Sequence, residues 1–431
     1  MNPRVLWGTI ALCVLARLAI AVGTDIYPDE AYYWTWSKQL QLAYFDHPAL
    51  IAWSIRLFGI RPGALVFGLA TLPGVYRLAK QLGADHLAAL TATALFASTP
   101  AANLLGTIAT PDAPLLCFWV WTLVALTSTH RLAWLATGAL WGLAMLSKYN
   151  GILLGAPILL VLFRQPLKVV GAGLVALVVT SPTLIWNATN DWEGFRFQFA
   201  HGLGGGGGLN TFLEFVGGQF GMAGPLLLVL MMVWLVKGPR RSPLALALVV
   251  PVLFFGWASL KARGEANWSA AAWIAGAVGV AQLNAPRLKL AALGLNVLAI
   301  VGGALILITP PPSLLGNQAV QKLHGWAALK RVEPLGLPVF TSRYQLSALT
   351  TYYAGVEAGT WEGRRSQYDL WPRPRIEQGT DALWIGEWDG PAPSLRDHFE
   401  SYEQMEWPAD ERQRALHDFK LFRLKNAKDT F

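Results

Sequence analysis

The sequence predicts a polytopic α-helical membrane protein with a small α/β domain after its last apolar segment. Hydrophobic residues make up 54% of the chain and charged residues only 14%, whereas about a quarter of the residues in a soluble domain are charged. Apolar segments recur as far as Ile308, and too little polar sequence separates them to cover one water-soluble core. Cys13 and Cys117 both lie in apolar segments, which predicts buried thiols rather than a disulfide or a metal site.

About eleven apolar segments have the length and composition of membrane-crossing helices. A bilayer core of roughly 30 Å requires about 20 helical residues. The first segment lacks a clear small-residue cleavage site and further segments follow it, so we interpret it as a retained helix rather than a signal peptide. Two segments, 132–146 and 150–163, are short and form a candidate pair that does not fully span. The predicted crossings are 4–23, 62–82, 86–106, 113–128, 132–146, 150–163, 168–186, 212–236, 243–260, 268–284 and 288–309.

Basic residues mark one side of the predicted membrane. The positive-inside rule places the basic loops in the cytoplasm, and the amino terminus with them. The alternate loops are mixed in sign and contain the acids Asp29, Glu30, Asp46 and Asp112, so they are predicted outside, together with everything after Ile308. Because the net charge of +8 lies largely in short loops, we expect no nucleic-acid partner. The basic loops contain Arg77, Lys80, Arg131, Arg164, Lys168, Lys237, Arg240, Arg241, Arg287 and Lys289, with Asp85 as their one acid.

The tail of the chain differs in composition from the rest. It is charged, it is punctuated by Pro and Gly, and it follows the stiff stretch Pro310-Pro311-Pro312. Short apolar runs alternate there with helical patterns, which predicts a small α/β domain. We therefore divide the chain into a membrane domain, 1–312, and an extracytoplasmic domain, 313–431. The expected elements are strands at Val339–Thr341 and Ala382–Ile385 and helices at Leu346–Tyr353 and Ala409–Leu416.

The first predicted outer loop joins two acids to a dense group of aromatic residues. Asp29 and Glu30 stand in the stretch YPDEAYYWTW, which also contains Tyr32. Adjacent carboxylates in a partly dry, aromatic setting have a raised proton affinity, which suits a general base. A solvated loop whose Trp and Tyr side chains anchor at the membrane interface explains the same residues equally well.

Asp112 and Lys148 are further candidates at the ends of predicted segments. Asp112 lies between Pro111 and Pro114 in TPDAPLLCFW, where a first-turn acid also suits the helix dipole. Lys148 stands in LSKYNG between two short apolar segments, and a lysine at head-group depth is costly unless it meets an anion. We expect a lipid phosphate as that anion; the alternative is a lysine that snorkels to the interface.

Another outer loop, KARGEANW, contains a second group of charges. Lys261, Arg263 and Glu265 suit either a phosphate clamp or a cluster that pairs with itself, and the clamp is our preferred interpretation. His47 and His201 lack a tight metal-ligand spacing, so we predict no metal site, although a divalent ion on carboxylates stays open.

In the tail, Arg364, Arg365 and the stretch Gln367–Trp371 suit contact with an anionic substrate. A cluster of surface salt bridges is an equally good interpretation of these residues.

Five stretches of the chain, taken in order, resemble the GT-C membrane glycosyltransferases. They are YFDHPALIAW, TPDAPLLCFW, LSKYNG, SPTLIWNATNDWEGFRFQ and RGEANW, and the first of them follows an outward Asp-Glu pair. The most similar branch is that of bacterial relatives of the protein O-mannosyltransferases and the lipid A aminoarabinose transferases. The resemblance covers residues 1–310. It implies a GT-C fold in the bacterial cytoplasmic (inner) membrane with its active side outward.

The resemblance also implies chemistry and roles. A sugar carried on a polyprenyl phosphate is transferred to a lipid, glycan or protein acceptor, with inversion at the anomeric carbon. Asp29 would be the base and Glu30 its partner, while Asp112 would position the acceptor or the base. Lys148 would hold the donor phosphate with Arg263 and Lys261, and no cofactor is required. The candidate substrate-binding residues are Tyr32, Asp46, His47, Tyr149, Glu265 and Asn267.

Two other classes of protein fit part of the same pattern. Charge near the membrane is also typical of a transporter or flippase of a lipid-linked or anionic substrate. Against this, the acids gather in outer loops, and the sequence shows no inverted repeat of broken helices. A structural or receptor protein with an outer binding domain is the third alternative.

Overall fold

The computed structural model describes residues 1–238, 242–387 and 390–431, and the chain forms two compact units. Unit 1 comprises residues 1–21 and 40–304, and unit 2 comprises residues 22–39 and 305–431. Arg240 and Arg241, two of the basic residues used to orient the chain, lie outside the described residues.

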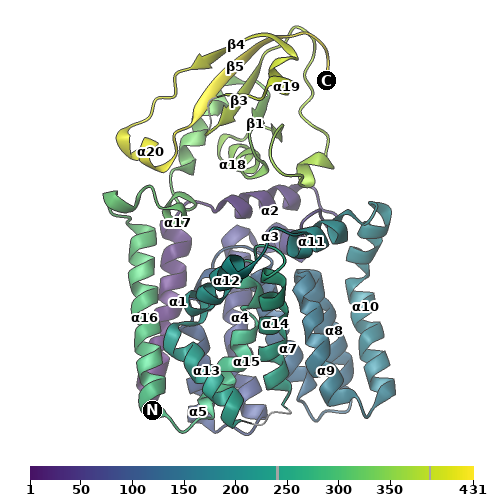
Figure 1. Cartoon of the computed structure of the whole chain (residues 1–431), viewed down its shortest axis with the longest axis vertical. Helices are drawn as coiled ribbons and strands as arrows, with labels where there is room; N and C mark the ends of the chain where they lie inside the picture. Colours follow the sequence, from purple (N-terminus) through teal and green to yellow (C-terminus); the bar gives the residue numbers. More distant parts are fainter. Residues whose placement is uncertain (239–241, 388–389) are drawn as a thin grey trace. The chain divides into compact units, whose positions relative to one another are not determined.

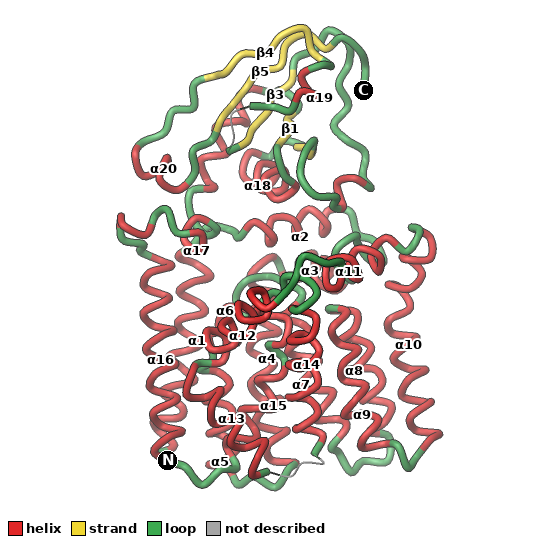
Figure 2. The backbone as a smooth tube through the Cα atoms, in the orientation of Figure 1, coloured by secondary structure: helices red, strands yellow, loops and turns green. Residues whose placement is uncertain are grey.

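Helices joined by loops make up the described part of unit 1 (Figures 1 and 2). Each of the eleven predicted apolar segments lies on one helix or on two consecutive helices. The helices that begin in unit 1 are α1 (Pro3–Gly23), α3 (Leu50–Phe58), α4 (Ile60–Gln81), α5 (His86–Ala97), α6 (Pro100–Leu105), α7 (Asp112–Leu126), α8 (Ala133–Ser147), η1 (Tyr149–Leu154), α9 (Gly155–Leu162), α10 (Pro166–Thr189), α11 (Glu193–Leu203), α12 (Leu209–Ala223), α13 (Pro225–Lys237), α14 (Pro243–Ser259), η2 (Ala266–Ser269), α15 (Ala272–Ala281) and α16 (Pro286–Ile308).

The helices of unit 1 pack in a continuous series, in which α10 contacts α8, α8 contacts α7, and α7 contacts α4. Small residues make the first of these contacts close. A Cβ atom at Gly138 would lie 2.4 Å from the carbonyl oxygen of Ala172, and one at Gly142 would lie 2.8 Å from that of Ala176. The Gly138-x-x-x-Gly142 spacing therefore packs against Ala172 and Ala176 of α10, as small residues do between helices in membranes.

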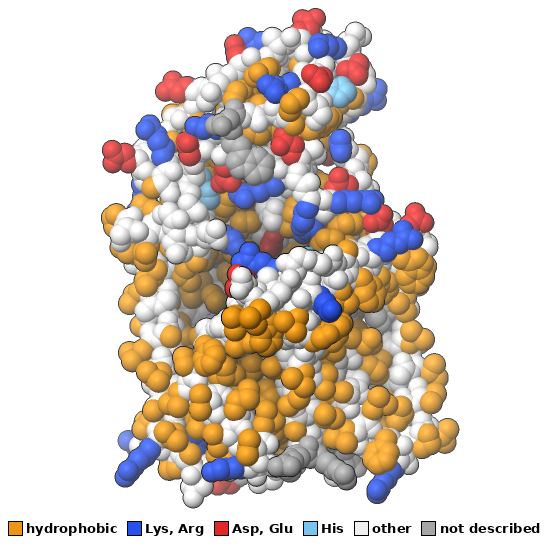
Figure 3. All heavy atoms as spheres, viewed as in Figure 1, with side chains coloured by type: hydrophobic (Ala, Val, Ile, Leu, Met, Phe, Trp, Pro, Cys, Tyr) orange, Lys and Arg blue, Asp and Glu red, His pale blue; other side chains and the backbone are white. Residues whose placement is uncertain are grey.

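The outer surface of unit 1 is apolar. Large hydrophobic side chains such as Leu174 and Val178 of α10 and Leu295 and Leu298 of α16 are exposed, and Figure 3 shows apolar side chains covering most of the visible face of this unit. Among the described residues, α1, α10 and α16 are each long and apolar enough to cross a membrane. Two bent pairs, α3 with α4 and α12 with α13, raise this number to five if each pair is one span. Eleven crossings stay a prediction.

The predicted single crossing 212–236 is in fact two helices. The helices α12 and α13 meet at Gly224 with a bend of 101°. Gly224 has a φ of +89°, and a Cβ atom there would lie 1.8 Å from Oδ1 of Asn296. Pro225 begins the next helix. A left-handed glycine followed by proline at the first helical position ends one helix and starts another, whatever the hydropathy of the run.

Unit 2 contains a five-stranded mixed sheet with the strand order β2-β1-β3-β5-β4. Strand β1 pairs in parallel with β2 and β3, whereas β5 is antiparallel to both β3 and β4. Strands β1 and β3 and helices α18 and α20 lie where the sequence predicted them. The elements that lie wholly in unit 2 are α2 (Pro28–Lys38), η3 (Pro312–Leu314), α17 (Gln318–Gln321), η4 (Trp326–Leu335), β1 (Val339–Thr341), α18 (Tyr344–Ala354), β2 (Ala358–Thr360), η5 (Gln367–Asp369), β3 (Ala382–Gly386), α19 (Pro393–Arg396), β4 (Phe399–Met405), α20 (Glu411–Leu416) and β5 (Lys420–Ala427).

Helix α2, which carries the two adjacent acids of the first loop, packs on α18 within unit 2. The ring of Tyr32 lies 4.5 Å from that of Tyr344, and its hydroxyl oxygen accepts a hydrogen bond of 2.7 Å from the backbone N–H of Gln367. The backbone N–H of Ile26 donates to the hydroxyl of Tyr353 over 3.0 Å. The aromatic residues of the first loop therefore bind that loop to the sheet-bearing segment of the chain.

A carboxylate of unit 2 lies in a network of side chains at the end of β3. Glu387 accepts from Arg343 over 2.5 Å, and its other oxygen lies 2.9 Å from Nδ1 of His417. His417 Nε2 donates to the carbonyl oxygens of Gln321 and His324. Burial alone would raise the pKa of Glu387, but the His417 hydrogen bond and the Arg343 charge outweigh it, so this pKa lies below its usual value of 4.5.

We predict that unit 2 loses stability when the pH falls below about 4.5. A carboxyl group whose pKa is lower in the folded protein stabilises the fold above its unfolded pKa, and that contribution is lost as the pH falls through the folded value. Hydrogen exchange at the amides of β3 and β5, corrected for intrinsic rates, should become faster in this range. Glu387→Gln should make the exchange less pH-dependent, whereas Glu377→Gln, at an exposed carboxylate, should not. An unchanged pH profile in Glu387→Gln contradicts the prediction.

Candidate functional site

Asp112 is the first residue of α7, and its side chain is buried. The helix begins there because Pro111 precedes it and Pro114 follows within the first turn, where a missing N–H costs no helical hydrogen bond. The Thr110 hydroxyl donates to Asp112 Oδ2 over 3.5 Å. An acid at this helix end is stabilised by the dipole, but a buried carboxylate also requires a charged partner.

Lys148 is that partner. Helix α8 ends at Ser147, and the extended backbone of Lys148 leads into η1. Its Nζ lies 2.8 Å from Asp112 Oδ1 and 3.0 Å from Oδ2, with side-chain exposures of 8% and 4% for the lysine and the aspartate. Because α7 and α8 pack along each other, the start of one helix meets the end of the other. The structure thus joins two residues that the sequence singled out separately.

Asn267 of η2 completes the group. Its Nδ2 donates to Asp112 Oδ2 over 3.0 Å. A second bond ties the same segments, since Nδ2 of Asn150 donates to the carbonyl oxygen of Trp268 over 3.2 Å. We call Asp112, Lys148 and Asn267 the Asp112 cluster. Asn150 and Thr110 were not singled out from the sequence, although they stand inside the motifs LSKYNG and TPDAPLLCFW.

The charges just before η2 lie on the surface of unit 1. Lys261, Arg263 and Glu265 are exposed. Arg263 forms an ion pair of 3.4 Å with Glu214 of α12, whose side chain is also exposed. Such pairs are worth about 0–1 kcal/mol, so the guanidinium is readily available to another anion. The predicted phosphate contact of Lys261 and Arg263 stays a prediction.

Asp46, His47 and Tyr149 are placed by local packing. Asp46 is buried, and its carbonyl oxygen accepts from Gln198 Nε2 over 2.5 Å. The carbonyl oxygen of His47 accepts from the backbone N–H of Tyr44, which closes a tight turn. The ring of Tyr149 packs 5.2 Å from that of Phe195 in α11. Their roles in substrate binding stay predictions.

Asp29 and Glu30 occupy the first turn of α2, in unit 2, and they differ in exposure. Glu30 is fully buried, and its Oε2 accepts from the backbone N–H of Tyr27 over 2.8 Å, so it caps the start of the helix. Asp29 is partly exposed. Asp29 is therefore the more exposed of the two carboxylates, Glu30 has a structural contact, and their roles in catalysis stay predictions. Tyr32, at 1% exposure, has a packing contact, and its predicted contact with substrate stays a prediction.

Among residues 1–238, 242–387 and 390–431, no group of three or more His, Cys, Asp and Glu side chains converges as a metal-binding set. The Asp112 cluster contains one carboxylate, one ammonium and one amide, which is a poor ligand set for a cation. That no cofactor is required stays a prediction, with a divalent cation on carboxylates as its alternative.

Comparison with known proteins gives three findings. Residues 46–186, which include Asp112 and Lys148, match the family described as dolichyl-phosphate-mannose-protein mannosyltransferase. The chain is 30% identical over 340 residues to the lipid A galacturonosyltransferase RgtD of Rhizobium johnstonii, an alignment that covers 72% of this chain and 70% of that protein.

The fold is similar to that of two crystal structures of ArnT from Cupriavidus metallidurans. The apo structure gives a TM-score of 0.62 at 16% identity and covers 96% of this chain and 97% of that one. The structure bound to undecaprenyl phosphate gives a TM-score of 0.64 at 15% identity and covers 98% of each chain. At these identities the likeness is one of fold.

Proposed function

The chain belongs to the GT-C membrane glycosyltransferases, and from this premise we propose that it transfers a sugar from a polyprenyl-phosphate donor to a lipid acceptor. The family expected from the sequence motifs is thereby confirmed, as is a multi-pass membrane protein. Two relatives support the finer proposal: one is named for its transfer of galacturonic acid to lipid A, and the other was crystallised with undecaprenyl phosphate. We propose that the reaction takes place at the outer face of the bacterial cytoplasmic membrane.

The observation that carries the proposal is the buried Asp112–Lys148 pair. An ammonium group has three N–H donors, and the two oxygens of Asp112 occupy part of this capacity. A leaving phosphate requires a fixed positive charge near the oxygen that gains the electron pair. In our proposal Lys148 supplies this charge, Asp112 holds the lysine in position, and Asn267 holds Asp112. Lys261 and Arg263 would assist by drawing the phosphate from the surface.

In the proposed transfer step, every bond, proton and electron pair is accounted for by the donor, the acceptor and the side chain of the base, without a cofactor. The acceptor hydroxyl loses its proton to Asp29, and its oxygen forms a bond to the anomeric carbon of the donor sugar. The bond from that carbon to the phosphate oxygen breaks, and the polyprenyl phosphate leaves with the electron pair. Attack from the side opposite the leaving group inverts the anomeric centre. Because phosphate departs as an anion, no general acid is needed if a cation stabilises it.

The proposal is tested by transfer in proteoliposomes. The purified full chain would be supplied with a polyprenyl phosphate carrying a labelled sugar and with lipid A as acceptor, and the lipid product identified by mass spectrometry. We expect a covalent product, and we expect it to form in the presence of EDTA. Movement of label across the membrane without a covalent product would favour the transporter alternative instead. Envelope lipids of a deletion strain should lack the same sugar mass.

Topology gives a separate prediction. We propose that the amino terminus lies in the cytoplasm, as the positive-inside rule predicts from the basic loops, and that residues 313–431 lie outside the membrane because the predicted number of crossings, eleven, is odd. A reporter that is active only in the cytoplasm should be silent when fused after Phe431. The same reporter fused after Lys237, in a basic loop, is the matched control and should be active. A strong signal from the fusion after Phe431 would refute this orientation.

A further inference from the structure

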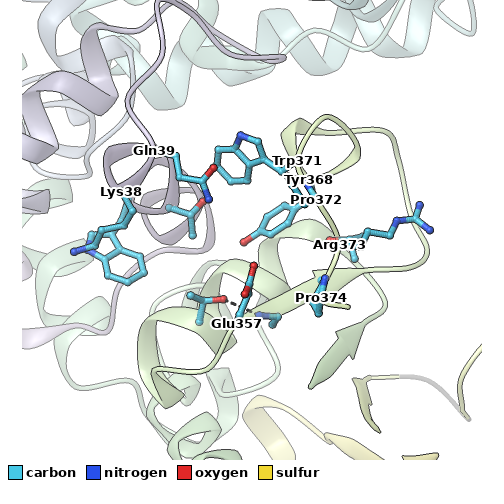
Figure 4. A pocket seen from close by; sticks show the side chains of 14 residues that line it. Lys38, Gln39, Glu357, Tyr368, Trp371, Pro372, Arg373 and Pro374 are labelled. Atoms are coloured by element: carbon cyan, nitrogen blue, oxygen red, sulfur yellow. Dashed lines mark hydrogen bonds between the residues drawn. The ribbon is translucent and has the colours of Figure 1, made fainter. Parts of the chain in front are cut away.

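Unit 2 contains a pocket that the proposed transfer step does not use. It lies between the end of α2, strand β2 and the segment after η5 (Figure 4), and part of it is open to solvent. Its lining combines aromatic rings with a few polar and charged side chains, as sites for small molecules do.

Aromatic rings form the apolar part of its wall. Trp34 lies at the α2 side, and Tyr368 and Trp371 lie at the side of η5. The ring of Trp371 meets that of Tyr368 edge to face, with centroids 5.7 Å apart, and Tyr368 stacks on Tyr32 behind it. Trp34 is held in the same way by Tyr352. Rings fixed by packing present flat apolar surface at little entropic cost on binding.

Groups that form hydrogen bonds lie between these rings. Figure 4 shows the Glu357 carboxylate and the Tyr368 hydroxyl pointing toward each other, with the Gln39 amide close to Trp371. Side chains of Thr35 and Thr351 also line the pocket. A ligand here would meet acceptors and donors around its edge and aromatic surface on its faces.

The charged side chains that line the pocket are two cations, Lys38 and Arg373, and one carboxylate, Glu357. Lys38 places its ammonium 4.6 Å from the centre of the Trp34 ring, and Arg373 places its guanidinium 5.0 Å from that of Trp361, so both cations are engaged on aromatic faces. Figure 4 shows the end of Arg373 directed away from the pocket. Within the described part of the chain, no cation lies within ion-pair distance of the Glu357 carboxylate.

We propose that this pocket binds a neutral or amino pyranose. A pyranose has an apolar face of C–H groups, which matches the aromatic surface, and hydroxyl groups around its edge, which match Glu357, Gln39 and the threonines. An amino group on the ring would pair with Glu357. A carboxylated sugar would meet Glu357 with a like charge and bind less well. The anion contact that the sequence predicts at Gln367–Trp371 stays a prediction.

Two kinds of molecule could supply a pyranose to this pocket. It is either a pyranose of the acceptor glycolipid, which rests on the proposed function, or a free saccharide. A measurement of free-sugar binding requires neither the donor nor the transfer reaction. It can therefore contradict the proposed pocket without contradicting the proposed function, and the transfer assay can do the reverse. If Trp371→Ala raises the KM for the lipid acceptor, the pocket holds the acceptor. If only free-sugar binding is lost, the pocket serves another saccharide.

The test is saturation-transfer NMR on the full chain in lipid nanodiscs, which avoids the sugar head groups of maltoside detergents. The probes are methyl glucoside, glucosamine and galacturonate. We expect signals from the first two and a weaker signal from galacturonate. Trp371→Ala should raise the Kd for methyl glucoside and the Kd for glucosamine, each on the order of tenfold. Glu357→Gln should weaken glucosamine more than methyl glucoside.

Matched controls keep the proposal falsifiable. Trp407→Ala removes a tryptophan of unit 2 that packs on Phe419 away from the pocket, and Glu377→Gln removes an exposed carboxylate; both should bind as the unchanged protein does. The fold of each variant is checked by hydrogen exchange in β3. The proposal is overturned if the unchanged protein gives no signal with either sugar. It is also overturned if folded Trp371→Ala and Glu357→Gln bind normally.

Discussion

Asp29→Asn is expected to lower the initial transfer rate about 10²–10⁴-fold, the usual effect of losing a general base. Asparagine keeps the shape of the side chain and accepts a hydrogen bond, but it cannot take the proton of the acceptor hydroxyl. Asp29 is partly exposed at the start of α2, so the change should leave the fold intact. The measurement is the rate in proteoliposomes with matched amounts of protein, with donor binding measured separately and expected to be normal.

Glu30→Gln is the matched control for this prediction. Glu30 is buried and caps α2 through the backbone N–H of Tyr27, a contact that glutamine can keep through its carbonyl oxygen. We expect a smaller loss of rate and a loss of stability on the order of 1 kcal/mol. If Glu30→Gln is inactive while Asp29→Asn turns over normally, the two roles are reversed. If both variants turn over normally, the base lies elsewhere and Asp112 becomes the first candidate.

The chemistry of the Asp112 cluster was predictable residue by residue, but its geometry was not. A lysine next to apolar segments and an acid between prolines are each unusual enough to stand out from the sequence. Their pairing joins positions 36 residues apart, and the bond from Asn267 spans 155 residues. Periodicity and composition describe local structure, so they cannot show which outer segments meet. The sequence therefore predicted a phosphate as the partner of Lys148, and it did not show that Asp112 is paired with this lysine.

The same reasoning explains which elements of unit 2 were missed. Strand β4, Phe399–Met405, exposes most of its side chains and carries two acids, so its sequence lacks an apolar alternation. Charged residues on an edge strand prevent it from pairing with other chains, and they also hide it from a search for apolar strands. By contrast, β1 and β3 are buried throughout and were found from their apolar runs.

Helix α2 shows a further limit of local patterns. Its aromatic residues suit an interfacial anchor or a sugar-stacking surface, and the sequence does not distinguish these from packing. The structure uses Tyr32 to contact Tyr344 and Gln367, which stand at the other end of the chain. The aromatic cluster thus marked the first loop as a candidate functional or packing surface. Which residues contact it could be learned only from the tertiary structure.

Lys148→Ala is expected to lower both stability and donor use, because the lysine neutralises a buried carboxylate. Breaking a buried ion pair by removing one partner typically costs about 3–5 kcal/mol. The loss of a charge-assisted contact with phosphate should weaken donor binding by a further 1.5–3 kcal/mol or so, roughly 10–150-fold. The thermal midpoint of the purified variant and its KM for the donor measure the two effects. Lys168→Ala, at a partly exposed lysine in the first turn of α10, should change neither.

The double variant Asp112→Asn/Lys148→Met separates the structural role of the pair from its role in catalysis. Asparagine and methionine keep roughly the volume of the two side chains and leave no buried charge, so the double variant should regain most of the stability that Lys148→Ala loses. It should nevertheless stay inactive, since no ammonium remains to stabilise the leaving phosphate. The thermal midpoint and the transfer rate of the same preparation give both answers. A stable double variant with normal turnover would show that the pair only holds α7 against α8, and that the phosphate is bound by other cations, of which Arg263 is the first candidate.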